Sequence, residues 1–269
     1  MGAATNARWS RQGRSELGGW HSVPRTLALA TILHDVKARL LEPLEAAAPT
    51  LRRYFSHFAV SLTDSTDRGI AAVLEEALGA RIIRHATGEA IIGQARRAAV
   101  RLALDDSSDC ILYSDIDHVL RWMNSDADEM AATLAAQPET QLLIIGRTEQ
   151  AMAASPQRLR DTESPVNRAY ELMTGRRADL LFAIRRMDRA VATDIVEHGQ
   201  VDSIANDVEW PLLAEQLGHR VGYVDARGLS YRTIEEYAAP SDGYDHDALQ
   251  WIRRIEMAGE MARAMRRYL

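Results

Sequence analysis

The sequence predicts an α/β fold in which a mostly parallel sheet carries helices on both faces and a C-terminal helix follows. Short apolar runs of strand length alternate along the chain with longer segments that have helical spacing. This alternation is typical of parallel sheets, because the crossover between two parallel strands is usually a helix. Turn residues separate the runs, and a chain of 269 residues can bury one substantial core.

The first half of the chain contains four predicted strands, at residues 26–33, 57–62, 81–84 and 111–113. Their short apolar runs are typical of buried parallel strands. Helices are predicted between them at residues 37–55, 69–78 and 94–104. The first helix has apolar residues three or four positions apart, and Gly79 is expected to end the second.

The second half continues the alternation. Helices are predicted at residues 127–136, 167–174 and 210–217. Each is followed by a predicted strand, at residues 140–145, 180–184 and 221–224. Residues 148–160 are expected to be irregular, and residues 248–269 to form a terminal helix. That helix has an apolar stripe of Trp251, Ile255, Ala258, Ala262, Met265 and Leu269. We expect the stripe to dock on the domain; a homo-oligomer interface or a face on an anionic membrane is the alternative.

Composition excludes several classes of function. The chain is 46% hydrophobic and 26% charged, with a net charge of -6, as in an ordinary globular protein. An acidic balance without a basic stripe argues against a nucleic-acid-binding surface. The single cysteine, Cys110, lies in a predicted strand and cannot form an intramolecular disulfide.

The sequence divides into three parts. Residues 1–25 lack the apolar centre of a signal peptide and are expected to form a flexible N-terminal tail. A main domain is expected at residues 26–239, and a C-terminal loop and helix at residues 240–269. No run of about 18 apolar residues is present, so no transmembrane segment is predicted, and a cytoplasmic protein is expected.

The stretch CILYSDIDHVLRWM, residues 110–123, is the most informative one. Its apolar run ends in Asp115 and Asp117, whose side chains would point to the same side of an extended chain. Open α/β sheets bind ligands at the carboxyl ends of their strands. A divalent ion that carries a diphosphate would let both carboxylates stay ionised. A solvated loop with acidic helix caps is the alternative. His118 would point the other way, as a packed or solvated side chain.

With these segments in place, the chain resembles a GT-A fold glycosyltransferase of the family 2 type, from about residue 27 to residue 233. The resemblance implies a GT-A-like fold, with a Rossmann-type nucleotide-binding half and an acceptor half that closes over it. It also implies a nucleotide-diphospho-sugar donor and a divalent metal cofactor, Mn2+ or Mg2+. The D-x-D motif would place the metal on Asp117, and the ribose or the same metal on Asp115.

Two further stretches resemble donor-binding segments of that family. TDSTD, residues 63–67, is similar to D-G-S-x-D, whose acidic residue holds the base or ribose, so the resemblance favours Asp64 over Asp67. An aspartate that caps the next helix is the alternative. GQARR, residues 93–97, is similar to G-x-A-R-N, which implies that Arg96 contacts the diphosphate. Arg97 replaces the asparagine, and an ordinary surface arginine is the alternative for Arg96.

A fourth stretch carries the catalytic assignment. NDVEW followed by GHRV is similar to the block E-D-x-x-L…G-Y-R-I, whose aspartate is the catalytic base in inverting members. The resemblance therefore assigns this role to Asp207, with Glu209 as the fallback. An acidic helix N-cap is the alternative for Asp207. Arg185 and Arg186 follow an apolar run and resemble a segment near the acceptor.

The chain departs from the family in one place that affects the metal. Many metal-dependent members have a histidine ligand after the last strand, whereas the equivalent residues 226–233 contain none. His246 is the neighbouring candidate for completing the metal shell; an inactive or metal-free variant is the other outcome.

The expected function is the transfer of a sugar from a nucleotide-diphospho-sugar to a hydroxyl or phosphate acceptor, metal-dependent and with inversion. A non-catalytic nucleotide-sugar-binding regulator is the first alternative. A nucleotidyltransferase is the second, although it would normally have a glycine-rich loop with a lysine after the first strand, and TILHDVK has no glycine.

Overall fold

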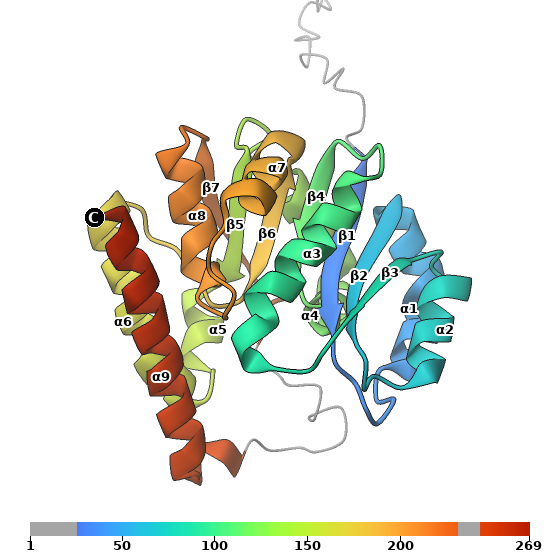
Figure 1. The fold of residues 1–269 in the computed structure, drawn as a ribbon, viewed down its shortest axis with the longest axis horizontal. Helices are drawn as coiled ribbons and strands as arrows, with labels where there is room; N and C mark the ends of the chain where they lie inside the picture. The colour runs from blue at the N-terminus through green and yellow to red at the C-terminus, as the bar shows by residue number, and fades with distance from the viewer. Residues whose placement is uncertain (1–25, 231–242) are drawn as a thin grey trace, which may run out of the picture.

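The computed structural model describes residues 26–230 and 243–269 (Figure 1). The expected N-terminal tail lies outside the described residues, as do residues 231–242 from the loop before the terminal helix. In the described part of the chain, no helix combines the length and the apolar character that a membrane crossing requires.

One sheet runs through the described part of the chain, with the strand order β3-β2-β1-β4-β6-β5-β7. Its strands are β1 (Leu27–Leu33), β2 (His57–Thr63), β3 (Arg81–His85), β4 (Cys110–Tyr113), β5 (Leu142–Arg147), β6 (Ile184–Asp188) and β7 (Val221–Ala226). Strand β6 is antiparallel to both of its neighbours, β4 and β5, and the other pairs are parallel. The predicted mostly parallel α/β sheet is confirmed.

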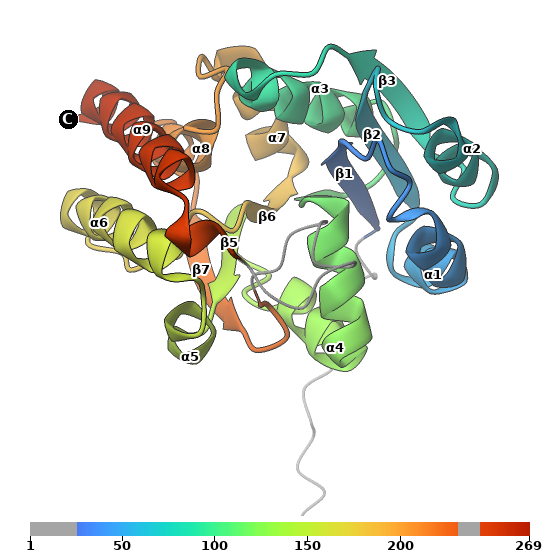
Figure 2. The same ribbon diagram turned by 90° about the horizontal axis from the view of Figure 1, so that it is seen from below.

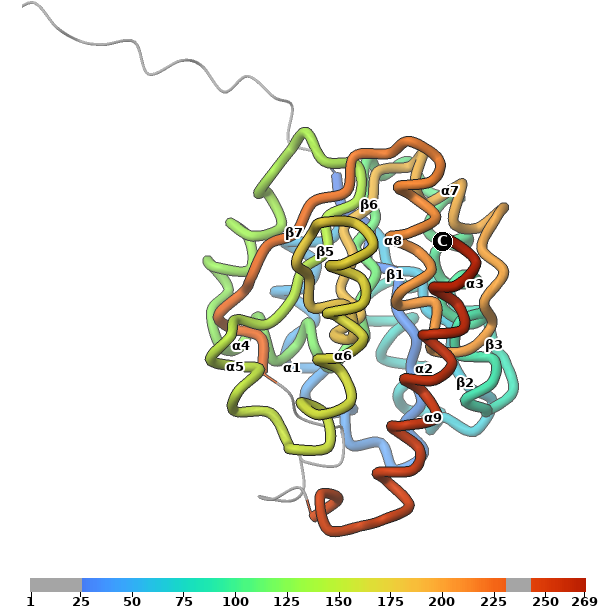
Figure 3. Tube along the Cα trace, turned by 90° about the vertical axis from the view of Figure 1, so that its left-hand side faces the viewer, coloured from blue at the N-terminus to red at the C-terminus, as the bar shows by residue number. Residues whose placement is uncertain are grey.

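Helices cover both faces of the sheet (Figures 2 and 3). One face packs against α1 (Leu41–Tyr54), α2 (Arg68–Glu76) and α4 (Ile116–Ala135). The other packs against α3 (Ile92–Leu104), α6 (Gln157–Thr174), α7 (Arg189–His198), α8 (Asn206–Gln216) and α9 (Ala248–Met265). A short helix, α5 (Glu149–Ala153), follows β5.

The alternation of side chains along the strands produces the two cores. In β1, Ala28 and Ala30 belong to the core beneath α3, whereas Leu29 and Leu33 belong to the core beneath α1 and α4. Because successive residues of a strand face opposite sides, an apolar run can be buried on both faces at once. Because β1 pairs in parallel with both β2 and β4, the carboxyl ends of these three strands lie together at one edge of the sheet.

The predicted strand at residues 180–184 is wrong. Leu180 to Phe182 form a turn, Ala183 has a φ of 55°, and strand β6 begins only at Ile184. Pattern reasoning missed β6 because it contains two arginines. Both are buried, and their guanidinium groups donate to backbone carbonyl oxygens, which satisfies the charged donors inside the protein.

Three other expectations need correction. Residues 148–160 are largely helical, in α5 and the first turn of α6, and α7 was not predicted. Helix α9 docks on α6 and α8 as expected, and Met265 of the predicted stripe is buried, but the other two buried residues, Met261 and Ala264, lie outside that stripe. Ile255 of the predicted stripe is 59% exposed, because the buried face is rotated away from it. The alternative use of α9 in a homo-oligomer stays a prediction.

Candidate functional site

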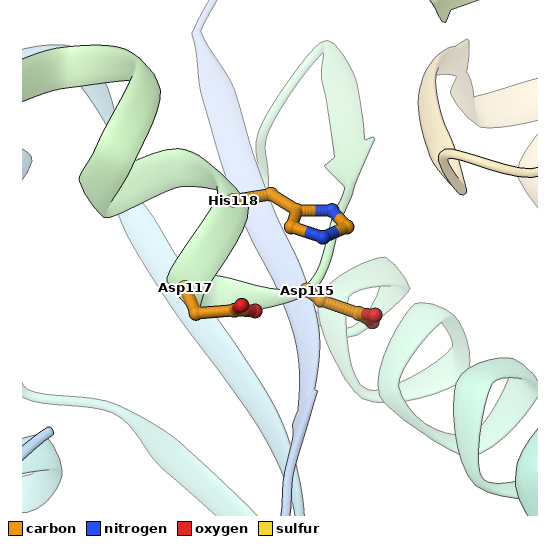
Figure 4. Close-up of side chains that lie close together, drawn as sticks. All are labelled: Asp115, Asp117 and His118. Carbon is orange, nitrogen blue, oxygen red and sulfur yellow. The ribbon is translucent and has the colours of Figure 1, made fainter. Parts of the chain in front are cut away.

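The two aspartates of the D-x-D motif lie at the start of a helix and not at the end of an extended strand. Strand β4 ends at Tyr113, Asp115 is the N-cap residue of α4, and Asp117 lies in its first turn. Their carboxylate oxygens still lie within 4.8 Å of each other, with Asp115 on extended backbone just before the helix and Asp117 in the turn that follows. Figure 4 shows Asp115, Asp117 and His118 pointing to the same side of the chain.

His118 corrects the prediction that it would point away from the carboxylates. Ligand atoms of Asp115, Asp117 and His118 all lie within 4.8 Å of one another. The His118 ring stacks on Phe182 at 4.3 Å between ring centroids, and its buried Nδ1 has no hydrogen-bond partner in the described part of the chain. The sequence argument failed because it extended β4 through Asp117. A helix start after Tyr113 would have placed His118 correctly.

This group fits a divalent cation. Two carboxylates and an imidazole with an unpaired nitrogen are a donor set for a metal of intermediate hardness. Other side chains orient the carboxylates: the Tyr113 hydroxyl donates to Asp115 Oδ1 at 3.0 Å, and Arg121 Nη2 donates to Asp117 Oδ2 at 2.7 Å. Among the described residues, His246, the ligand suggested by the sequence, is not part of this group.

Arg96 joins this group to Asp207, two residues that lie far apart in the sequence. The Arg96 side chain is buried, and its Nη1 donates to Asp207 Oδ1 at 2.6 Å and to Asn206 Oδ1 at 2.9 Å. On the other side, its Nη2 lies 4.0 Å from Asp115 Oδ2. The structure therefore brings Arg96, Asp115, Asp117 and Asp207 into one continuous cluster, which we call the Arg96 cluster.

Burial and charge act in opposite directions within the Arg96 cluster. Burial raises the pKa of the Asp207 carboxyl above its usual range, although Arg96 and Arg185 both act to lower it. Burial lowers the pKa of Arg96, but the negative charges of Asp207 and Asp115 outweigh this and raise it overall. Asp207 is thus a carboxylate held among cations in a site that penalises its charge.

Neither of the alternatives for Asp207 and Arg96 matches their surroundings. Helix α8 has Ala205 as its N-cap residue, and the Asp207 side chain accepts from Arg96 rather than capping the helix. Arg96 is only 3% exposed, so it is not an ordinary surface arginine. Glu209, the fallback for the base, accepts the backbone N–H groups of Gln200 and Val201 at 2.7 and 3.0 Å.

A cavity of about 380 Å³ opens at the carboxyl ends of β1 and β2, and Ala95, the residue before Arg96, is part of its lining. It is lined by Ile32, Leu33, His34, Thr63, His85, Thr87, Gly88, Glu89, Ile92 and Ala95. Asp64 directly follows Thr63 and is exposed, whereas the Asp67 side chain caps α2 by accepting from Gly69 N at 2.7 Å. Asp64 is therefore available for a ligand in a way that Asp67 is not.

Arg185 and Arg186 do not lie where an acceptor could reach them. Arg185 is 1% exposed and donates to the backbone oxygens of Leu180 and Asp207, at 2.6 and 3.2 Å. Arg186 donates to carbonyl oxygens at the end of α4. Arg185 thus ties β6 to the preceding turn and to α8, and Arg186 ties it to the end of α4.

The sheet topology identifies the fold class of the protein. A mostly parallel sheet with β6 inserted antiparallel between β4 and β5, and with an acidic group at the start of α4, is the GT-A fold, which confirms the predicted fold class. No protein-family model matches the sequence, and no curated protein matches it in sequence.

Solved structures are similar in fold to the described chain. A crystal structure of glucosyl-3-phosphoglycerate synthase from Mycobacterium tuberculosis aligns with 87% of this chain and 81% of its own, at 14% identity and a TM-score of 0.53. The same enzyme in complex with Mn2+, UDP-glucose and phosphoglyceric acid aligns with 87% and 80%, at 15% identity and a TM-score of 0.51. A complex of this enzyme with Mn2+, UDP and glucosyl-3-phosphoglycerate aligns with 87% of this chain and 81% of its own, at 15% identity and a TM-score of 0.51.

Proposed function

We propose that the protein is a glycosyltransferase that moves a sugar from a nucleotide-diphospho-sugar to a hydroxyl or phosphate acceptor, with a divalent cation and with inversion. One observation carries this proposal: the donor atoms of Asp115, Asp117 and His118 lie close enough together for a divalent cation, and Arg96 joins them to Asp207. The cluster lies at the edge of the sheet where α/β proteins bind ligands. The likeness to a fold that binds UDP-glucose with Mn2+ supports it.

The donor would extend from the cavity to the Arg96 cluster. We assign the base and ribose to the cavity beside Asp64, and the diphosphate to Arg96, whose planar guanidinium suits phosphate oxygens. Asp115, Asp117 and His118 would hold the cation. Because the set includes an imidazole, it favours Mn2+ over Mg2+. The bound cation would supply positive charge beside the departing diphosphate.

The remaining chemistry is a proton transfer. As the acceptor oxygen bonds to the anomeric carbon and the bond to the diphosphate breaks, the acceptor hydroxyl must lose its proton. We assign this proton to Asp207, because a raised pKa makes the carboxylate a stronger base. Arg96 would then offset the charge that develops on the leaving group. Since Asp207 is buried and paired with Arg96, an acceptor reaches it only after neighbouring side chains move.

Ligand binding followed by turnover tests the proposal. Thermal unfolding with nucleoside diphosphates, each with and without Mn2+, should reveal one base that raises the melting temperature most when Mn2+ is present. The matching nucleotide-sugar, incubated with hydroxy-acid and phosphate-bearing acceptors, should release nucleoside diphosphate. If no nucleoside diphosphate stabilises the protein under any condition, the proposed function is wrong.

A non-catalytic nucleotide-sugar-binding regulator remains the second candidate, and one observation favours it. The proposed base is buried and already bound by Arg96, and Arg97, in place of the family's asparagine, pairs with Asp202 and donates to the Val201 carbonyl. A regulator would bind the donor and protect it from hydrolysis, so turnover of the bound donor separates the two functions.

A further inference from the structure

We propose that Arg121 makes cation binding depend on the nucleotide diphosphate; this inference rests on the proposed function of the same site. Arg121 lies one helical turn after Asp117 on α4, and its Nη2 donates to Asp117 Oδ2 at 2.7 Å. Both side chains are largely shielded from solvent, with 13% and 10% of their surface exposed. One of the two carboxylates of the cation group is therefore already neutralised by a fixed positive charge.

The second carboxylate has a similar neighbour. Asp115 lies 4.0 Å from Arg96 Nη2, so two guanidinium groups flank the two carboxylates of the site. Most carboxylate sites attract a divalent cation through their net negative charge. Here Arg121 pairs with Asp117, and Arg96, whose main partner is Asp207, partly offsets the charge of Asp115. A cation held by Asp117 would also come close to the Arg121 guanidinium, because both would contact the same carboxylate. The site should therefore bind a bare divalent cation weakly.

A nucleotide diphosphate reverses this balance. It brings two or more negative charges and several oxygen ligands to the same place, which compensates for the arginines. By linkage, the factor by which the diphosphate tightens cation binding equals the factor by which the cation tightens diphosphate binding. Arg121 would thus prevent the cation from occupying the site without its donor.

Arg121 is the residue to change because it can be separated from the rest of the cluster. Arg96 joins α3 to α8 through Asn206 and Asp207, so its removal would disturb packing as well as charge. Arg121 and Asp117 lie on the same helix, and replacing Arg121 leaves that link intact. Arg121→Gln removes the charge and keeps hydrogen-bonding capacity. Arg121→Met keeps the apolar stem, and Arg121→Lys keeps the charge.

The experiment measures the affinity of the full-length protein for Mn2+ by calorimetry, without and with saturating UDP. The wild type should bind Mn2+ weakly alone and roughly a hundredfold more tightly with UDP. Removal of a positive charge at about 5 Å in a partly shielded site should tighten binding of Mn2+ alone by roughly tenfold or more in Arg121→Gln and Arg121→Met. Mn2+ binding with UDP present should change less, because the diphosphate would draw Arg121 away from Asp117 in the wild type, and the enhancement by UDP should therefore shrink. Arg121→Lys should resemble the wild type.

The control is Arg168→Gln, which removes an exposed arginine from an i,i+3 pair with Glu171 on α6 and should change neither affinity. The role of Arg121 would be overturned if Arg121→Gln and Arg121→Met bound Mn2+ no more tightly than the wild type and UDP still enhanced that binding fully. The proposed function would still stand in that case. A wild type that binds none of the nucleoside diphosphates, with or without Mn2+, would reject the proposed function itself.

Discussion

Two buried arginines, each placed between two carboxylates, have different surroundings in this protein. Arg96 lies between Asp207, at 2.6 Å, and Asp115, at 4.0 Å. Arg147, at the end of β5, lies between Asp179, at 2.8 Å, and Glu163, at 2.5 Å. Residue types and burial alone would not distinguish them. Hydrogen bonding does.

The cluster around Arg147 is nearly complete. Its side chain donates to Asp179, Glu163 and Ser155, its backbone N–H donates to Asp179, and Arg254 of α9 binds the second oxygen of Glu163. Arg254 Nε, at the rim, is the atom without a partner among the described members of this cluster. Such a cluster is typical of a structural connection between β5, α6 and α9.

The Arg96 cluster leaves several buried groups unsatisfied. Within the described part of the chain, Arg96 Nε has no hydrogen-bond partner. The same holds for three atoms around the cluster: His118 Nδ1, Asn206 Nδ2, and Nε1 of Trp210, whose ring packs edge-on against Tyr113. Buried polar groups are rarely left in this state without a reason. The carboxylates of the two clusters also differ in pKa. Burial raises the pKa of Asp207 on balance, whereas at Asp179 the effect of Arg147 outweighs burial and lowers the pKa. This incomplete satisfaction supports the proposal that a ligand binds at the Arg96 cluster.

The largest expected effect is on stability, at the cluster around Arg147. Arg147→Met leaves Asp179 and Glu163 buried without their main partner, and should lower the free energy of unfolding by about 3–5 kcal/mol. Urea unfolding measures this change. The exposed variant Arg168→Met is the control and should cost about 0.5 kcal/mol or less. A loss below about 1 kcal/mol in Arg147→Met would mean that the two clusters do not differ as described.

The next largest expected effect is on activity, at the Arg96 cluster. Asp117→Ala removes a ligand of the proposed cation and should reduce sugar transfer by at least roughly 10²–10³-fold. Some stability should be lost because Arg121 loses this partner, but less than in Arg147→Met, which leaves two buried carboxylates without their main partner. Steady-state transfer rates check this against Asp128→Ala, an exposed aspartate on the same helix. Similar rates in both variants would exclude Asp117 from the reaction.

Asp207→Asn separates a base from a positioning residue. The asparagine oxygen can still accept from Arg96, so donor affinity should stay close to that of the wild type, while the turnover rate falls by roughly 10²-fold or more. Wild-type turnover should also fall with decreasing pH through a pKa above the usual aspartate range, because Asp207 must be ionised to accept a proton and burial raises its pKa. That acidic limb should be absent in Asp207→Asn. Full activity in this variant would remove the base assignment.

The smallest effect distinguishes two aspartates of the same turn. Asp64→Ala should weaken donor binding by roughly tenfold, the range for one hydrogen bond to a charged group, with little change in stability. Asp67→Ala removes the N-cap of α2 and should cost about 1 kcal/mol of stability with unchanged donor affinity. Calorimetric titration with the donor and thermal unfolding measure the two quantities. Equal donor affinity in both variants would remove the assignment of Asp64.

The sequence was sufficient for the architecture but not for every element. Apolar runs bounded by turns correctly predicted β1, β2, β4 and β5, because burial on both faces leaves a clear pattern. The same reasoning failed at β6, where Arg185 and Arg186 are buried because backbone carbonyl oxygens satisfy them. That compensation depends on tertiary contacts that no local pattern contains.

The site shows a similar limit. Motif resemblance selected Arg96, Asp115, Asp117 and Asp207, and the structure brings all four together. It missed His118, because it extended β4 through Asp117 and predicted the next helix only from residue 127, whereas α4 begins at Ile116 and places His118 in its first turn. It could not foresee the pairing of Arg96 with Asp207, since the two residues are 111 positions apart.

Anomalous scattering from Mn2+ in a crystal grown with Mn2+ and UDP tests the central claim most directly. The account predicts one strong peak among Asp115, Asp117 and His118, in contact with diphosphate oxygens. A second group of potential ligands, Asp194, Glu197 and His198, lies on α7. A peak there with none at the start of α4, or UDP bound away from the cavity beside Asp64, would contradict the account.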